Sequence, residues 1–194
     1  MLRRVTRDFQ AMRLFTGVEL SEEVSRNLER LLTHLRPAAH LRWSPVYNLH
    51  ITTKFIGEWT ESRLGEITAA LESIAGRRTV AIGISGLDWF PNPRNPRVFF
   101  ALVHGGDALT DLARDVESAL ESLGIARENR PYSPHLTLAR INRAVPLDQL
   151  RQAVAALESV DFGEFPADRF FLYRSKLGAT GSVYTKLAEF PFSK

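Results

Sequence analysis

The sequence contains NLHITTKFIG at residues 48–57 and PHLTLAR at residues 134–140. Each stretch holds a histidine, an aliphatic residue and a threonine in that order, starting at His50 and at His135. Both stretches are rich in aliphatic and β-branched residues, which predicts strands. Residues two apart in a strand point to the same face, so each histidine is expected to project beside its threonine. The aliphatic residue between them, Ile51 or Leu136, should face a core.

The two histidines are 85 residues apart, and sliding the chain against itself by that distance aligns more than the two tripeptides. The aligned pairs include Phe15 with Phe100, Val18 with Val103, Val24 with Leu109, Leu31 with Val116, Leu35 with Leu120, and Val98-Phe99 with Val183-Tyr184. No gap is needed. We interpret this agreement as an ancient duplication that gives two similar lobes, each presenting an equivalent strand to one cleft.

The remaining pattern predicts an α+β fold with antiparallel pairing. Strands are expected near 12–18, 49–56, 79–88, 97–103, 134–141, 166–175 and 182–190. Helices are expected from Ser21 to Pro37 and near 64–74, 107–123 and 147–158. The segments 79–88 and 97–103, and later 168–175 and 182–188, have the spacing of hairpins. This order does not fit a doubly wound parallel sheet.

Length and composition limit the class of protein. A chain of 194 residues fits one domain, or two lobes that share a cleft. We expect a flexible extension over residues 1–11 and a single two-lobed domain over 12–194. Cysteine is absent, which excludes disulfides, thiolate metal sites and cysteine nucleophiles and suits the cytoplasm. No apolar run predicts a signal peptide or membrane span, and the net charge of +3 favours an anionic partner.

Two histidines and two threonines form a complete set for phosphodiester chemistry. Near neutral pH one imidazole can accept a proton while the other donates one. The hydroxyls of Thr52 and Thr137 can donate hydrogen bonds to phosphate oxygens. No metal is required. A single His-x-Thr is common by chance, but two copies in equivalent register are not. A zinc site would need a third ligand, and His34, His40 and His104 lack suitable spacing.

The text around the two stretches is specific enough to resemble a known family. Arg42-Trp43-Ser44-Pro45 precedes the first stretch, and Arg130-Pro131-Tyr132-Ser133 precedes the second. Together these segments resemble the two signatures of the 2H phosphoesterases, above all the RNA 2′,3′-cyclic phosphodiesterase branch, also called LigT-like or 2′–5′ RNA ligase. The resemblance extends over nearly the whole chain from residue 12. Ile51 and Thr53 stand where the family usually has Leu, and Tyr132 stands where it more often has Phe.

The resemblance implies a two-lobed α+β fold: pseudo-twofold duplicated antiparallel sheets, outer helices and a central cleft, with lobes that are not simple halves of the chain. It implies cofactor-free and metal-free hydrolysis of terminal 2′,3′-cyclic phosphates to 2′-phosphates, with 2′–5′ ligation as a side activity. His50 would be the proton donor and His135 the proton acceptor, with Thr52 and Thr137 holding the phosphate. The sequence itself cannot order the histidines, because the repeat makes them equivalent.

Four more residues are candidates for substrate binding. Arg140 is either a phosphate ligand or a solvated side chain, because strand alternation places it opposite His135 unless a bulge intervenes. Lys54, expected on the His50 face, is either a phosphate ligand or a charge at the cleft rim. Trp43 and Tyr132 can stack a base; the alternative for Trp43 is loop packing.

The expected partners are RNA ends or nucleoside 2′,3′-cyclic phosphates, bound by a monomer without an obligatory protein partner. Two other functions stay open. The chain is either an RNA-end-binding module without turnover, or a phosphoesterase for another small cyclic phosphate, such as ADP-ribose 1″,2″-cyclic phosphate.

Overall fold

The structure is a computed structural model that describes residues 11–178 and 181–193. The flexible extension expected over residues 1–11 lies outside the described residues except for Ala11. That residue already belongs to the first strand, where it pairs with Thr60.

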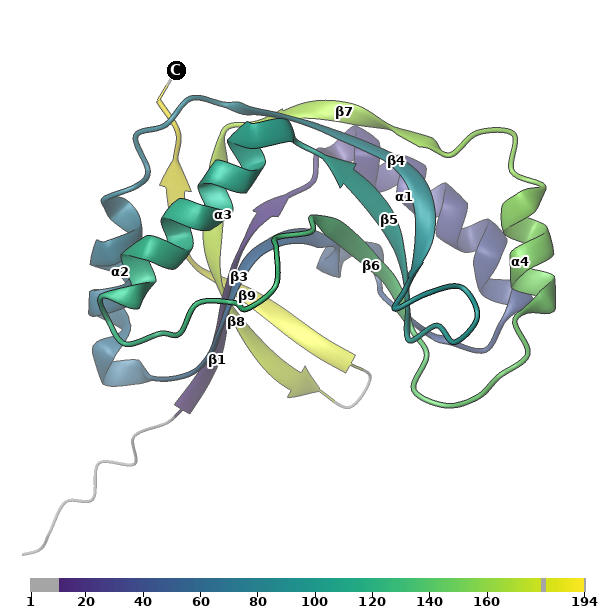
Figure 1. The fold of residues 1–194 in the computed structure, drawn as a ribbon, viewed down its shortest axis with the longest axis horizontal. Coiled ribbons are helices and arrows are strands. Elements are labelled where there is room, and N and C mark those ends of the chain that lie inside the picture. Colours follow the sequence, from purple (N-terminus) through teal and green to yellow (C-terminus); the bar gives the residue numbers. More distant parts are fainter. Residues whose placement is uncertain (1–10, 179–180, 194) are drawn as a thin grey trace, which may run out of the picture.

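Nine strands and four α-helices make up the described chain, joined by three short 3₁₀ helices (Figure 1). In chain order they are β1 (Ala11–Glu19), α1 (Glu22–Leu35), β2 (Arg42–Trp43), β3 (His50–Thr60), α2 (Leu64–Glu72), β4 (Val80–Phe90), β5 (Val98–His104), α3 (Gly106–Glu121), β6 (His135–Arg140), α4 (Asp148–Ala155), β7 (Asp161–Ala167), β8 (Arg169–Gly178) and β9 (Gly181–Pro191). Within residues 11–178 and 181–193, no helix is long and apolar enough to cross a membrane.

The strands form two antiparallel sheets, as the α+β prediction requires. The first sheet has the order β3-β1-β8-β9, and the second has the order β2-β6-β5-β4-β7. We call the first sheet with α2 and α3 the first lobe, and the second sheet with α1 and α4 the second lobe. In Figure 1 these helices cover the outer sides of the two sheets, with α2 and α3 on the left and α1 and α4 on the right.

The lobes exchange elements, which confirms that they are not simple halves of the chain. A shift of 85 residues carries β3 and β1 of the first sheet onto β6 and β5 of the second. The same shift carries β4 onto β8, but β4 lies in the second sheet and β8 in the first. Helix α1 packs on β7 of the second lobe, whereas α3 packs on β3 of the first. The chain therefore crosses between the lobes several times.

Helix α1 illustrates how the local sequence produces this arrangement. The Ser21 hydroxyl caps its start by accepting a hydrogen bond from the backbone N–H of Val24 at 3.2 Å. The predicted apolar face is buried, with Val24, Leu28 and Leu35 fully inaccessible. The amide of Asn27 donates to the backbone carbonyl of Phe162 in β7 at 2.9 Å, which fastens α1 to the second lobe.

Two strands and several boundaries differ from the sequence prediction. β3 continues past Gly57 to Thr60, because Gly57 adopts a positive φ of 87° within the strand. β2 and β7 are not predicted; β2 has only two residues, and β7 contains Gly163 and Pro166, which usually interrupt strands. β7 tolerates its proline because it lies at the edge of the second sheet.

Candidate active site

The two His-x-Thr segments meet where the sheets adjoin. β3 lies at the edge of the first sheet, and it contacts β6 of the second sheet, as Figure 1 also shows. The Tyr132 hydroxyl, just before β6, donates a hydrogen bond of 3.0 Å to the backbone carbonyl of Thr52 in β3. We call this meeting place of β3 and β6 the sheet junction.

Each histidine is anchored in the same way. Nδ1 of His50 lies 2.7 Å from the backbone carbonyl of Asn48, and Nδ1 of His135 lies 2.8 Å from that of Ser133. A carbonyl only accepts hydrogen bonds, so each Nδ1 carries a proton. In the neutral imidazole the lone pair is therefore on Nε2. The anchoring carbonyls, like the histidines, are related by the 85-residue repeat, so both rings present the same nitrogen for chemistry.

Aromatic rings support both imidazoles. Phe15 stacks on His50 with ring centroids 4.5 Å apart, and Phe100, its repeat equivalent, meets His135 edge-on at 5.5 Å. Gly17 lets β1 approach the His50 ring closely. A Cβ at this position would lie 2.8 Å from the carbonyl oxygen of Ile51 and 3.4 Å from Cδ2 of His50. These contacts fix each ring without using its Nε2.

The two threonines lie beside the histidines as alternation predicts. Thr52 and Thr137 are half-buried like the two histidines, whereas Ile51 and Leu136 are completely buried on the opposite face. The hydroxyls of both threonines form no hydrogen bond with any other residue in 11–178 or 181–193. They are therefore available to a bound anion.

The electrostatic environment of His50 favours the neutral ring. Burial lowers the pKa of His50 to about 4, although the bond to Asn48 opposes this effect. Coulombic repulsion from His135 and Arg140 contributes to the same lowering of the pKa of His50. These two groups thus act on His50 from the second lobe. In the protein without substrate, His50 is neutral near pH 7.

A β-bulge follows each His-x-Thr segment at equivalent positions. In β3, Thr52 pairs with Gly17 and Lys54 with Thr16, so Thr53 is the additional residue. In β6, Thr137 pairs with Phe100 and Ala139 with Phe99, so Leu138 is the additional residue. A bulge reverses the alternation of the residues that follow it. The residues after each segment therefore exchange faces.

Comparison with known proteins agrees with this duplicated arrangement. The model of the family described as LigT like phosphoesterase matches the chain twice, over residues 18–100 and 103–184. The two matches begin 85 residues apart, which supports the duplication predicted from the repeat. The chain belongs to the LigT-like phosphoesterase family.

Individual LigT-like relatives match over most of the chain. An RNA 2′,3′-cyclic phosphodiesterase of Methanothermobacter thermautotrophicus is 31% identical, with 92% of this chain and 98% of the relative covered. The protein of that name from Thermus thermophilus is 34% identical, with 92% and 89% covered. A crystal structure of a Thermus thermophilus protein superimposes with a TM-score of 0.79 at 33% identity, covering 93% of this chain and 97% of the other.

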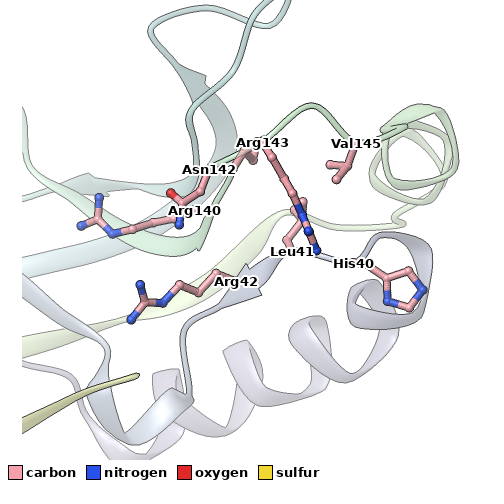
Figure 2. Close-up of a pocket in the computed structure, with 8 residues that line it drawn as sticks. His40, Leu41, Arg42, Arg140, Asn142, Arg143 and Val145 are labelled. Carbon is pink, nitrogen blue, oxygen red and sulfur yellow. The ribbon is translucent and has the colours of Figure 1, made fainter. Parts of the chain in front are cut away.

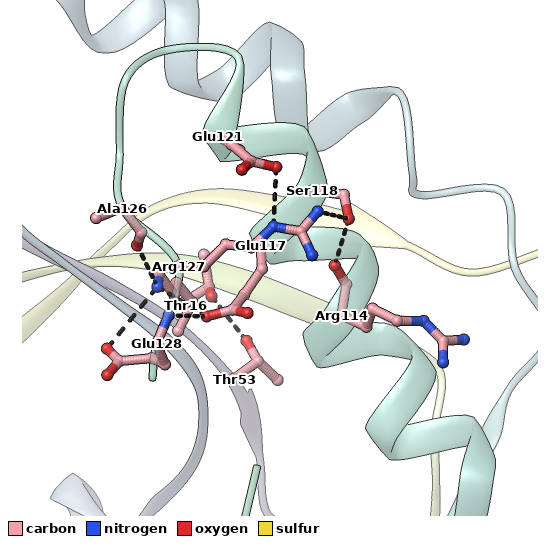
Figure 3. Close-up of polar contacts among 10 residues, drawn as sticks. Thr16, Thr53, Arg114, Glu117, Ser118, Glu121, Ala126, Arg127 and Glu128 are labelled. Atoms are coloured by element: carbon pink, nitrogen blue, oxygen red, sulfur yellow. Dashed lines mark hydrogen bonds and ion pairs between the residues drawn. The ribbon is translucent and has the colours of Figure 1, made fainter. Parts of the chain in front are cut away.

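The prediction that Lys54 lies on the His50 face of this LigT-like site is wrong. Its side chain is 2% exposed, and its Nζ lies 2.8 Å from Oε1 of Glu117 in α3 and 2.8 Å from the carbonyl of Ala126. The surroundings of this ion pair appear in Figure 3. The bulge at Thr53 is the cause, because it turns Lys54 to the buried face. Phe55, 59% exposed, is turned to the outer face instead.

The equivalent bulge at Leu138 brings Arg140 to the face of His135 and Thr137. Ala139 is completely buried, whereas Arg140 is exposed, which is the reverse of uninterrupted alternation. Its charge acts on His50, as described above. The bulge thus places Arg140 where either alternative, a phosphate ligand or a solvated side chain, is geometrically open. The repeat equivalent of Arg140 is Phe55, so the two lobes present different chemistry at this position.

Trp43 and Tyr132, the two candidates for stacking a nucleotide base, are both held by contacts within the protein. The indole N–H of Trp43 donates to the carbonyl of Ala39 at 3.1 Å, and its ring meets the buried Phe99 edge-on. These contacts support the packing alternative for Trp43, in strand β2 and not in a loop, and its stacking on a base stays a prediction. The ring of Tyr132 packs against the core, and burial raises the pKa of its hydroxyl. Its hydrogen bond to Thr52 makes Tyr132 a link between the lobes.

Sequence reasoning missed several residues that shape the site. Phe15 and Phe100 support the imidazoles, Asn48 and Ser133 supply the anchoring carbonyls, and Gly17 allows the close approach of β1. The repeat contained the signal for four of them, since Phe15 aligns with Phe100 and Asn48 with Ser133. No sequence pattern marks Gly17, because its role depends on a contact between neighbouring strands.

Proposed function

We propose that this protein hydrolyses RNA 2′,3′-cyclic phosphate ends to 2′-phosphates by acid–base catalysis between two histidines. The observation that carries the proposal is the matched anchoring of His50 and His135 through Nδ1, which leaves Nε2 of each ring for the substrate. The names of the LigT-like relatives, RNA 2′,3′-cyclic phosphodiesterases, supply the substrate class.

In the proposed reaction, water attacks the phosphorus while Nε2 of His135 accepts a proton from it. The bond between phosphorus and the 3′-oxygen breaks, and Nε2 of His50 gives its proton to that oxygen. The phosphate stays on the 2′-oxygen. Thr52 and Thr137 donate hydrogen bonds to the non-bridging oxygens, and Arg140 balances their charge. The same steps with a 5′-hydroxyl in place of water join that hydroxyl to the phosphorus while the 3′-oxygen leaves, which gives a 2′–5′ linkage.

The donor role requires His50 to bind a proton before the reaction. The free protein holds it neutral, with a pKa of about 4, but a phosphate anion beside the ring raises the pKa of His50 again. In His135→Gln, residual activity should therefore fall as pH rises, because protonated His50 is then the remaining catalyst. A residual rate that increases with pH would assign the acceptor role to His50 instead.

We further propose that the enzyme acts in the cytoplasm as a monomer without an obligatory partner. Its own side chains supply every group that the reaction needs, so the proposed catalysis requires no metal or cofactor. Size-exclusion chromatography with light scattering tests the monomer; a dimer as the active species would contradict it.

Phosphorus NMR of the product tests the proposed function. A nucleoside 2′,3′-cyclic phosphate is incubated with the protein, with and without EDTA. We expect the 2′-phosphate as sole product at rates that EDTA does not change. Activity lost to EDTA and restored by zinc would replace the two-histidine mechanism. Tight binding of an RNA end without turnover would identify a binding module. Turnover of ADP-ribose 1″,2″-cyclic phosphate alone would identify the other phosphoesterase.

A further inference from the structure

A groove lined by basic residues adjoins the proposed active site at the end of β6. It has a volume of about 470 Å³ and is lined by His40, Leu41, Arg42, Arg140, Ile141, Asn142, Arg143 and Val145 (Figure 2). This volume lies within the range of sites that bind small molecules, roughly 300–1,000 Å³. We call it the arginine groove. Arg140 belongs both to the groove and to the surroundings of His50, so the groove begins where the site ends.

The charges along the groove have one sign. Three arginines and a histidine line it, and no acidic residue does. Within residues 11–178 and 181–193, none of these four side chains forms an ion pair with a carboxylate. The positive charge of the three arginines is therefore available to an anion from solution, whereas seven of the other fifteen arginines of the described chain, such as Arg63 and Arg169, pair with acids.

Two of the arginines stand directly opposite each other. Arg42 of β2 and Arg140 of β6 are register partners on adjacent strands. Like charges in this position destabilise a sheet, and a phosphate between them would remove the repulsion. In Figure 2 the guanidinium groups of Arg42 and Arg140 reach toward the same side, while Arg143 and His40 lie farther along the groove. Basic groups thus occur at intervals along one path.

The groove offers the proposed substrate a place for the rest of its strand. A cyclic phosphate terminates the 3′ end of an RNA strand, so the rest of the strand must leave the site from its 5′ side. Arg140 adjoins the reacting phosphate, and Arg143 and His40 lie farther along the groove, where upstream nucleotides have room. Leu41, Ile141 and Val145 give the groove apolar surface for sugars or bases.

We propose that the arginine groove binds the phosphates of the nucleotides upstream of the cyclic end, so that the preferred substrate is a single-stranded oligonucleotide. This inference rests on the proposed function, which defines the cyclic end. It adds a second binding region, made by Arg143 and His40, that a mononucleotide does not reach.

The test compares kcat/KM for a nucleoside 2′,3′-cyclic phosphate with that for an RNA trimer bearing the same cyclic end. Arg143→Gln and His40→Gln change the far part of the groove, and Arg114→Gln on α3 is a control with the same loss of charge. We expect each groove variant to lower kcat/KM for the trimer about three- to tenfold while mononucleotide turnover stays the same. The control should change neither.

The salt dependence of kcat/KM distinguishes a phosphate contact from a purely structural role, because only the loss of a phosphate contact changes it. Loss of one phosphate contact to a single strand should reduce the slope of log kcat/KM against log salt by about 0.7. The proposal would be overturned if Arg143→Gln left kcat/KM for the trimer unaltered. It would also be overturned if this variant lowered kcat/KM equally for both substrates. If the wild-type protein turns over neither substrate, the proposed function fails by itself. Binding of a trimer with a terminal 3′-phosphate, measured by fluorescence anisotropy, then tests the groove with the same variants.

Discussion

The His50 ring is buried beside two positive groups, and this disfavours its protonated form. The free energy of unfolding should therefore depend on pH. The pKa of His50, about 4 in the folded state, lies below the ordinary value of 6.5. Between these values the unfolded chain binds more protons than the folded one, so stability falls as pH falls from 6.5 through 4. The site thus holds His50 neutral in the free protein at the expense of stability in acid.

His50→Gln should remove this dependence. We expect the wild-type free energy of unfolding to decrease by about 2 kcal/mol more than that of the variant between about pH 7.5 and 4.5. Urea denaturation at both pH values measures it, and the exposed His34→Gln serves as control. An equal decrease in the free energy of unfolding of wild type and His50→Gln would mean that His50 is not buried as described.

At the scale of single elements, the two bulges decide which side chains reach the site. The repeat and the alternation predicted His50, Thr52, His135 and Thr137 because these residues precede the bulges. Alternation places Lys54 on the wrong face and does not decide the face of Arg140, because both residues follow a bulge. A bulge is a feature of pairing between strands, so neither Thr53 nor Leu138 marks it in the sequence.

The helices and strands also differ in how far the local sequence predicts them. Helices α1 and α3 were predicted from their apolar spacing, whose buried faces the structure confirms. β7 was missed, since its only local signals, Gly163 and Pro166, suggest a loop. Its pairing with β4 supplies what the local sequence lacks. The family resemblance implied only that the lobes are not simple halves of the chain, and nothing in the sequence predicts the exchange of β4 and β8.

Lys54→Met tests the structural role that the bulge gives to Lys54. It leaves the carboxylate of Glu117, whose side chain is 20% exposed, without its cation, and should cost about 2–4 kcal/mol of stability. Lys186→Met breaks an exposed pair with Glu19 and should cost less than about 1 kcal/mol. Well below the unfolding temperature, kcat of Lys54→Met should stay within about threefold of wild type. A hundredfold loss of kcat in folded Lys54→Met would contradict the structural role and indicate that Lys54 takes part in catalysis.

At the scale of the whole molecule, the site exists only where the lobes meet. One histidine comes from each sheet, and the charge on His50 responds to His135 and Arg140 of the other lobe. The hydrogen bond from Tyr132 to Thr52 crosses this junction. The relative position of the lobes therefore controls the relative position of the two imidazoles.

Tyr132→Phe removes this bond without changing the ring. We expect about 1 kcal/mol of lost stability, the usual value for one hydrogen bond. We also expect a several-fold lower kcat with little change in KM, because the strand carrying His50 and Thr52 is less well fixed. Tyr47→Phe, at a side chain that is 87% exposed, should alter neither quantity. Unchanged kcat in Tyr132→Phe would show that the bond does not position the site.

The most direct measurement of the central claim is the rate of cyclic-phosphate hydrolysis by His50→Gln, His135→Gln and the double variant, each verified as folded by circular dichroism. If the two imidazoles act in one transition state, each single variant should lose about 10²–10⁴-fold in kcat, the usual contribution of general acid–base catalysis. The double variant should lose more than either single variant but far less than the product of the two losses, because residues acting as a unit are not additive. Either single variant retaining wild-type activity within about tenfold, or a double variant whose loss equals the product of both, would contradict a shared site at the sheet junction.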